Sequence, residues 1–311
     1  MPRTRTAASG ATAQEVEVGG RVVRLSHLDR QVFPAAGWTK ADVVGYYAAA
    51  GPALLAHVRG RPMTLRRFPE GVRGPSRYLK CCPEPRPPWV RVAEVPRVGG
   101  GPAMDPCLVD DLASLVWAAN LGCLELHPML ARAEDLDRPT AVVLDLDPGP
   151  PAGLLEACEV ALLARAALAG VGLRAWVKTS GGKGLHVVVP LQPAAPFART
   201  RAFARTVAEV LAAERPSLVL ARGGPAARAG RVLVDWGQNA RHKSIVAPYS
   251  LRAAEHPEVS APVRWEEIEA AVREHDAAAL RCTPRGVLAR LERDGDLHAP
   301  VIAGGQRLPG G

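Results

Sequence analysis

Several features that would assign a chain to a membrane or export class are absent from this sequence of 311 residues. No apolar run can cross a bilayer, because the most apolar helical stretch, GLLEACEVALLARAALAGVG, contains Glu156, Glu159 and Arg165. The first residues, MPRTRTAASGATAQE, lack the apolar segment of a signal peptide. We therefore expect a cytoplasmic protein that does not associate with membranes.

Cysteine pairs with the spacing of a metal site are also absent. None of the six cysteines forms a C-x-x-C pair, and Cys81 and Cys82 are adjacent. The pattern predicts neither a zinc site nor a disulfide framework, and it fits a reducing cytosol.

Positive charge, by contrast, is in excess. Lysine and arginine outnumber aspartate and glutamate by 39 to 31, a formal net charge of +8. Such an excess favours a polyanionic partner, either nucleic acid or an anionic surface, although arginine-rich composition can also follow from genomic bias. The charge alone does not choose between these explanations.

Strand-like and helix-like segments alternate along the chain without strict regularity, which predicts an α/β or α+β domain with a mixed sheet. We expect a flexible tail over residues 1–20, one domain over 21–305 and a C-terminal tail over 306–311. Residues 81–105, rich in proline and glycine, are expected to form loops. The expected strands are 21–26, 61–69, 141–149, 231–237 and two within 174–191. The expected helices run from Thr39 to about Pro52 and over 111–122, 153–170, 197–213, 264–280 and 284–293.

Three aspartates end hydrophobic strands. Asp145 and Asp147 in AVVLDLDPG point to one face of their strand, about 6.6 Å apart, and Asp235 ends the run VLVD. If the two strands are neighbours, the carboxylates converge and can share two divalent cations, Mg²⁺ or Mn²⁺, for phosphoryl transfer. An isolated D-x-D is more often a solvated strand end, but Asp235 repeats the context.

The segment KTSGGKGLH, residues 178–186, joins two of the expected strands. Its glycines allow backbone amides to approach an anion closely, and Ser180, Lys183 and His186 add polar and charged groups. The turn therefore suits a triphosphate, while a plain hairpin turn is the alternative. Farther along, Arg241, His242, Lys243 and Arg252 form a basic group that by itself is best interpreted as solvated surface charge.

Taken in order, DLDPG, KTSGGKGLH, VDWGQN and VAPYSLR resemble the polymerase domain of the bacterial end-joining DNA ligase D, in the archaeo-eukaryotic primase superfamily. The segments LDRQVFPAAGWTKADVVGYY, GRPMTLRRFPEGV and WAANLGCLELHP extend the resemblance over about residues 20–300. No ligase K-x-D-G motif is present, so we expect a stand-alone polymerase domain. The resemblance implies a primase-type fold and template-directed addition of nucleotides, preferably ribonucleotides, to a DNA 3′ end with Mn²⁺ or Mg²⁺.

The resemblance also implies roles for individual residues. Metal ligands would be Asp145, Asp147 and Asp235. The nucleotide would be bound by His127, Ser180, Lys183, His186, Gln238 and Arg252. Gapped or recessed DNA with a 5′-phosphate would be bound by His27, Arg30, Lys40, Arg66, Arg77 and Tyr78. A nucleoid-associated location is implied, with the Ku end-binding protein and a separate ATP-dependent ligase as partners.

This sequence departs from the family pattern at several DNA-binding positions. His27 and Arg30 stand where the family commonly has Asn and Lys, and Arg66 stands where lysine is common. The aromatic pair that stacks on template bases corresponds to Arg77 and Tyr78. An arginine can replace an aromatic ring here because its planar guanidinium also stacks on bases.

Two other function classes fit parts of the sequence. DLDPG resembles the D-x-D motif of haloacid-dehalogenase phosphatases, but Gly149 stands where that chemistry needs Thr or Val. A non-catalytic scaffold that binds DNA ends would explain the basic charge, but it leaves the three aspartates without a role.

Overall fold

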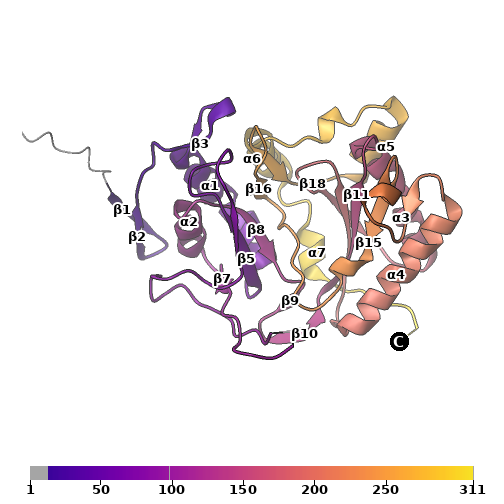
Figure 1. The fold of residues 1–311 in the computed structure, drawn as a ribbon, viewed down its shortest axis with the longest axis horizontal. Coiled ribbons are helices and arrows are strands. Elements are labelled where there is room, and N and C mark those ends of the chain that lie inside the picture. Colours follow the sequence, from indigo (N-terminus) through magenta and orange to yellow (C-terminus); the bar gives the residue numbers. More distant parts are fainter. Residues whose placement is uncertain (1–12, 98, 311) are drawn as a thin grey trace, which may run out of the picture.

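A computed structural model describes residues 13–97 and 99–310 of the chain (Figure 1). The first twelve residues of the expected N-terminal tail lie outside the described residues. The part that follows is ordered earlier than expected, because β1 (Gln14–Val18) pairs antiparallel with β2 (Arg21–Leu25). The C-terminal tail is packed on the domain, since Gln306 bonds the backbone of Arg174 and Leu308 is buried.

A six-stranded sheet forms the right half of the molecule in Figure 1. Its strands, in spatial order, are β14 (Val219–Leu220), β15 (Val232–Asp235), β11 (Ala141–Pro148), β13 (Leu185–Pro190), β12 (Trp176–Thr179) and β18 (Pro262–Val263). All pairs are antiparallel except β14 with β15. This confirms the mixed sheet.

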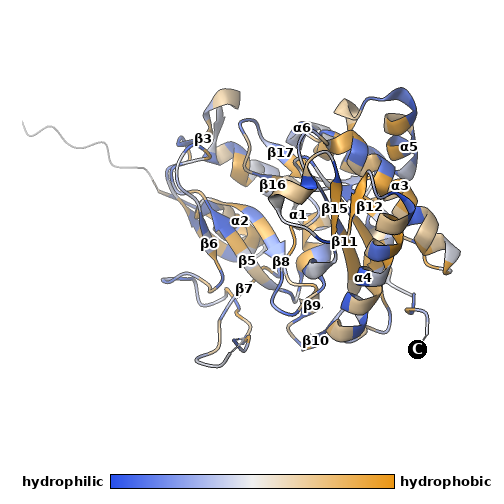
Figure 2. Cartoon of the chain, turned by 45° about the vertical axis from the view of Figure 1, so that its right-hand side comes forward, coloured by the Kyte–Doolittle hydropathy of each residue, from blue (hydrophilic) through white to orange (hydrophobic). Residues whose placement is uncertain are grey.

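Helices cover one face of this sheet. Those on its outer side are α3 (Leu154–Gly170), α4 (Phe197–Glu214) and α5 (Trp265–Glu274). Along β11, Leu144 and Leu146 are fully buried in the main core with α3. Ala141 and Val143 lie on the other face with Val188. The strands of this sheet are coloured as hydrophobic in Figure 2, and apolar residues are buried on both of its faces. The aspartates at the end of β11 therefore interrupt an otherwise apolar surface.

A smaller antiparallel sheet forms the left half. It contains β6 (Arg77–Leu79), β5 (Pro62–Arg67), β7 (Cys107–Leu108) and β8 (Cys123–Pro128), with both β7 and β8 paired to β5. Two helices pack beside it, α1 (Lys40–Val58) and α2 (Leu112–Asn120). Short elements complete the chain: β3 (Gln31–Phe33), β4 (Trp38–Thr39), β9 (Ala131–Arg132), β10 (Asp135–Pro139), α6 (Pro284–Asp294) and α7 (Ala299–Ala303).

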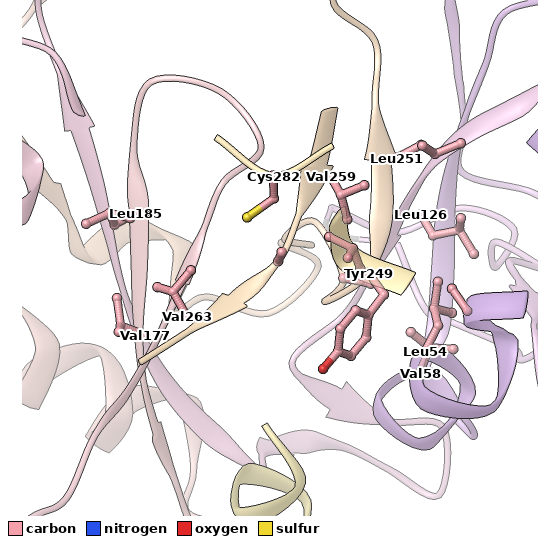
Figure 3. Close-up of a cluster of buried hydrophobic side chains, with 14 of the residues drawn as sticks. Leu54, Val58, Leu126, Val177, Leu185, Tyr249, Leu251, Val259, Val263 and Cys282 are labelled. Carbon is pink, nitrogen blue, oxygen red and sulfur yellow. The ribbon is translucent and has the colours of Figure 1, made fainter. Parts of the chain in front are cut away.

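The hairpin of β16 (Ser250–Arg252) and β17 (Glu258–Ser260) connects the two halves. Figure 3 shows Leu251 and Val259 of this hairpin between residues of α1 and β8 on one side and of β12 and β13 on the other. The Tyr47 hydroxyl donates to Leu124 O and accepts from Leu251 N. The core is therefore continuous across the junction, and the two sheets are held in a fixed relation.

Most expected elements are present, with three differences. The helix begins next to Thr39, which caps α1 in a capping box with Asp42, but Pro52 lies inside the helix, which continues to Val58. Continuation buries Leu54 and Val58, and this apolar burial outweighs the hydrogen bond that proline cannot make. The expected helix over 264–280 ends already at Glu274, where His275 adopts a positive φ.

The third difference concerns cysteine. Cys82 and Cys107 form a disulfide, although the sequence pattern predicted none. The loop that follows β6 folds back, so that Cys82 N donates to Asp105 O and brings the thiols together. A separation of 25 residues carries no local signature of this pairing. Within the part of the chain that is described, no helix has the length and apolar character to cross a membrane.

Candidate active site

One row of polar residues crosses the six-stranded sheet. Asp145, on the central strand β11, lies opposite Asp235 of β15 on one side and His186 of β13 on the other. His186 in turn lies opposite Lys178 of β12. Strand register alone thus aligns residues 90 positions apart along the chain, Asp145 and Asp235, and the two aspartate strands are neighbours, as the metal-site hypothesis requires.

Gln238 connects two of the aspartates. Its side-chain amide donates to Asp145 Oδ2 at 3.4 Å and to Asp235 Oδ2 at 3.2 Å. The short helical turn that carries it, Trp236–Gln238, begins at Asp235, whose Oδ1 accepts from Gly237 N. The motif VDWGQN therefore places a carboxylate and the amide that orients it in one turn.

Asp147 has a different environment. Lys183 Nζ lies 3.0 Å from Asp147 Oδ1, and an Arg228 guanidinium nitrogen lies 2.7 Å from Oδ2. Arg228 ends the short helical turn before β15 and carries no motif in the sequence, so sequence reasoning missed it. The carboxylate of Asp147 is held by two protein cations.

The three carboxylates do not form a single metal-binding group in this arrangement. Among residues 13–97 and 99–310, no three His, Cys, Asp or Glu side chains are close enough to hold a metal. The donor chemistry nevertheless fits a divalent cation, because all three side chains offer only oxygen, which Mg²⁺ and Mn²⁺ prefer. An ion at Asp147 would compete with Lys183 and Arg228, and the metal site stays a prediction.

Burial shapes the charges of the row. Desolvation, with Lys178 nearby, lowers the pKa of His186 to about 4, so the ring is neutral at pH 7. Burial alone would raise the pKa of Asp145, but His186, Lys178 and Gln238 outweigh it and hold that pKa below its usual value. Desolvation also lowers the pKa of Lys178 well below that of a free lysine. His186 Nδ1 is buried and has no hydrogen-bond partner in the described structure.

The glycine turn packs tightly against its neighbours. Ser180 and Gly184 close it, with Ser180 N donating to Gly184 O and Gly184 N to Ser180 Oγ. A Cβ on Gly181, whose φ is +69°, would overlap Arg252, and one on Gly184 would overlap Leu146 O. These two glycines are needed for packing, whereas Gly182 is exposed and a Cβ there would meet only Ser180 Oγ, at 3.7 Å.

A cavity of about 400 Å³ lies over this end of the sheet. Asp145 and Asp147 line it, and so do all six side chains predicted to bind a nucleotide: His127, Ser180, Lys183, His186, Gln238 and Arg252. Asp235 is not part of the lining and joins the site through Gln238. The structure therefore brings together residues from β8, β11, β13, β16 and the glycine turn.

The smaller sheet supplies the opposite wall. His127 of β8 and Arg252 of β16 both bond the carboxylate of Glu125, at 2.9 and 3.3 Å. Arg66 of β5 bonds the same carboxylate at 3.2 Å. Glu125, 1% exposed, was not identified in the sequence, because a glutamate in a strand gives no sign of such partners.

Of the two residues predicted to stack on template bases, Arg77 and Tyr78, one lies on this wall of the cavity. Arg66 lies opposite both Tyr78 and Glu125 in the strand register, so their side chains share one face. Tyr78 is 57% exposed, and its ring packs edge-on against His127 at 6.0 Å. Arg77 precedes Tyr78 in β6 and therefore points to the other face of the sheet. Arg77 and Tyr78 do not form one stacking surface.

The three residues predicted to bind a 5′-phosphate lie together, away from the cavity. Lys40 N donates to Arg30 O, and Arg30 N donates to His27 O, so the turn before β3 sits on the first turn of α1. His27 and Arg30 are exposed, whereas the Lys40 ammonium is buried and donates to Ser26 O. Burial and two neighbouring arginines lower the pKa of Lys40 to about 8.

The basic residues that follow Asp235 in the sequence do not lie together in the structure. Arg252 lines the cavity, whereas Arg241 makes a surface ion pair with Asp137 at 3.2 Å. Arg241 is therefore solvated surface charge, as the simpler interpretation of the sequence had it.

Comparison with known proteins agrees with this geometry. Residues 39–298 match the model of the LigD primase-polymerase domain family. The multifunctional non-homologous end joining protein LigD of Mycolicibacterium smegmatis is 37% identical over 283 residues, and that of Pseudomonas aeruginosa is 35% identical over 252. These matches cover 90% and 79% of this chain but only 36% and 29% of the relatives, so the chain spans about a third of their length.

A solved structure is similar over nearly the whole fold. The polymerase domain of Mycobacterium tuberculosis ligase D in complex with DNA superposes with a TM-score of 0.84 at 35% identity. The match covers 90% of this chain and 98% of that domain. This confirms the expected primase-type fold. The chain belongs to the family of LigD primase-polymerase domains.

Proposed function

We propose that the chain is a template-directed nucleotidyltransferase that adds nucleotides, preferably ribonucleotides, to DNA 3′ ends at gaps or double-strand breaks during non-homologous end joining. The observation that carries the proposal is the cavity, which joins two strand-end aspartates to six side chains suited to a nucleoside triphosphate. Family membership and the DNA complex of the similar polymerase domain support the same activity.

The reaction would be attack of a primer 3′-hydroxyl on the α-phosphorus of the nucleotide, with pyrophosphate as the leaving group. Lys183 and the exposed amide of the glycine turn at Gly182 would neutralise charge on the β- and γ-phosphates. Arg252, at the other wall, would clamp the triphosphate from the opposite side. His127, which lies beside Tyr78, would contact the ribose of a bound nucleotide.

Two Mn²⁺ or Mg²⁺ ions, held by Asp145, Asp147 and Asp235, would activate the attacking hydroxyl and stabilise the leaving oxygens. Gln238 would keep Asp145 and Asp235 oriented toward each other. Lys183 and Arg228 neutralise Asp147 in the described arrangement, which lowers the cost of keeping three carboxylates close together.

The proposed DNA substrate has a recessed or gapped end with a downstream 5′-phosphate. The phosphate would lie at His27, Arg30 and Lys40, where the exposed side chains of His27 and Arg30 meet the first turn of α1. Ku and a separate ATP-dependent DNA ligase are the proposed partners, in a cytoplasmic, nucleoid-associated setting.

The test is extension of a labelled primer on gapped DNA that carries a downstream 5′-phosphate. NTPs and dNTPs are compared with Mn²⁺ or Mg²⁺, for the native chain and for Asp145→Ala. We expect metal-dependent addition, faster with NTPs, that the variant lacks. DNA binding without addition under any condition would reject the polymerase and favour a non-catalytic end-binding scaffold. Release of phosphate from small esters without DNA would favour a phosphatase.

A further inference from the structure

Glu125 divides its two carboxylate oxygens between two sets of partners. Oε1 accepts from Arg66 at 3.2 Å and from Ala253 N at 3.1 Å. Oε2 is bonded by His127 at 2.9 Å and by Arg252 at 3.3 Å. Oε1 thus bonds the arginine that packs against Tyr78, and Oε2 bonds two residues that line the nucleotide cavity.

Arg66 extends this connection to the surface. Its guanidinium lies 5.1 Å from the Tyr78 ring centre and 4.9 Å from that of Phe68, and its Nε donates to Ser76 Oγ. Tyr78 is exposed and is the ring on this face to which a template base can stack. The Tyr78 ring is therefore connected through one guanidinium to the carboxylate of Glu125, and it also contacts His127 directly.

Glu125 itself does not line the cavity, so it acts on a nucleotide only through its partners. It is the carboxylate to which both Arg66 and Arg252 are paired, and these arginines come from different elements, β5 and β16. Burial alone would raise the pKa of Glu125, but His127, Arg252 and Ala253 N outweigh it and hold that pKa at about 2. The charge is therefore fixed across the physiological pH range.

We propose that Glu125 is a positioning residue that couples template stacking at Tyr78 to nucleotide binding by His127 and Arg252. The inference rests on the proposed function and deepens it, because it names the group that makes nucleotide affinity depend on the template. Arg252 uses one guanidinium nitrogen for Glu125, which leaves other donors free for a triphosphate. Without the carboxylate, Arg66, Arg252 and His127 lose the group to which all three are bonded.

The test measures equilibrium binding of a fluorescent ATP analogue with Mn²⁺, in the presence and absence of templated DNA. Wild type should bind the analogue more tightly with the template. Glu125→Gln keeps the size of the side chain but removes its charge, and it should weaken binding about tenfold with the template and abolish most of the template effect. In primer extension the same variant should raise KM for NTP about tenfold and leave kcat within about twofold.

Two variants make the result specific. Glu125→Asp keeps the charge and should recover part of the template effect. Asp294→Asn is the matched control, because Asp294 on α6 also pairs with two arginines, Arg264 and Arg293, and it should leave nucleotide binding unchanged. If Glu125→Gln does not fold, as judged by circular dichroism, Arg66→Met replaces it and should also reduce the template effect.

The outcomes separate the inference from the proposed function. Binding of the analogue that responds to the template, without any primer extension, would reject the polymerase but support the coupling. Extension by wild type with an unchanged template effect in Glu125→Gln, or in Arg66→Met, would overturn the coupling. A loss of kcat with unchanged KM would also overturn it, because that result assigns Glu125 to the chemical step.

Discussion

Each of the two sheets carries a row of polar residues beside the cavity, and the rows differ in how many partners bond their carboxylates. On the smaller sheet, the row Tyr78–Arg66–Glu125 contains one carboxylate with four donors. On the larger sheet, the partners of Asp145 among the described residues are the neutral ring of His186 and the Gln238 amide. A carboxylate whose oxygens are all bonded holds neighbouring side chains in place, whereas a carboxylate with unbonded lone pairs can also bind a cation.

Asp147 lies between these two cases. Its partners, Lys183 and Arg228, are about half and one-third exposed, so water and substrate phosphates can reach them. Such ion pairs are worth little and exchange readily, unlike the buried contacts of Glu125. The comparison therefore favours chemistry and triphosphate binding at the larger sheet and template-dependent recognition at the smaller one.

The largest expected effect is the loss of a cavity-lining aspartate on the larger sheet. Asp147→Ala should lower the rate of nucleotide addition by at least about 10³-fold, because the proposed divalent cation loses one of its carboxylate ligands. DNA binding, measured by fluorescence anisotropy, should stay within about threefold of wild type. Addition at near-normal rates would show that the strand-end aspartates are structural.

The next effect compares two glycines of one turn. Gly181→Ala should destabilise the fold by about 1–3 kcal/mol and weaken nucleotide binding, because a Cβ there overlaps Arg252 at a left-handed φ. Gly182→Ala should change stability by less than about 0.5 kcal/mol, since its Cβ meets nothing closer than Ser180 Oγ at 3.7 Å. Thermal unfolding of the two variants checks the difference. Equal losses of stability would contradict the packing described for this turn.

A smaller effect separates the two residues of β6. Tyr78→Ala should weaken binding of templated DNA by about 1–3 kcal/mol, the usual value of one base stacked on one aromatic ring. Arg77→Ala should weaken it less, and only at low salt, because Arg77 lies on the other face and contributes charge alone. Titrations at two salt concentrations distinguish the cases. A larger effect at Arg77 would place the template on the opposite face of the sheet.

The smallest effect is a pH dependence at the proposed 5′-phosphate site. The pKa of Lys40 is lowered to about 8, so the ammonium is mostly charged at pH 7 and mostly neutral at pH 9. The preference for gaps with a 5′-phosphate should therefore fall about threefold over this range. Rates on gaps with and without the phosphate give the preference. Lys40→Arg keeps its charge throughout and should show no such fall; a preference that is constant in wild type would remove Lys40 from the site.

Sequence reasoning identified the parts of the site that short motifs carry. DLDPG, KTSGGKGLH and VDWGQN each hold their functional residues within a few positions, and all the nucleotide-binding residues predicted from them line one cavity. The metal-site hypothesis required the strands of Asp145 and Asp235 to be neighbours, and the structure pairs these two residues.

The residues that were missed act through long-range register. Glu125 and Lys178 owe their surroundings to partners on other strands, and Arg228 reaches Asp147 across 81 positions. The Cys82–Cys107 disulfide likewise depends on a loop that folds back over the smaller sheet. None of these pairings leaves a periodic or local pattern in the sequence, so the folded structure was needed to find them.

The most direct test of the division between the two sheets is single-turnover nucleotide addition at saturating NTP, with Asp145→Asn and Glu125→Gln measured side by side. If chemistry belongs to the larger sheet and recognition to the smaller one, Asp145→Asn should abolish addition at every NTP concentration, and Glu125→Gln should approach the wild-type rate once NTP saturates. Addition by Asp145→Asn, or a defect of Glu125→Gln that saturation does not relieve, would contradict this division.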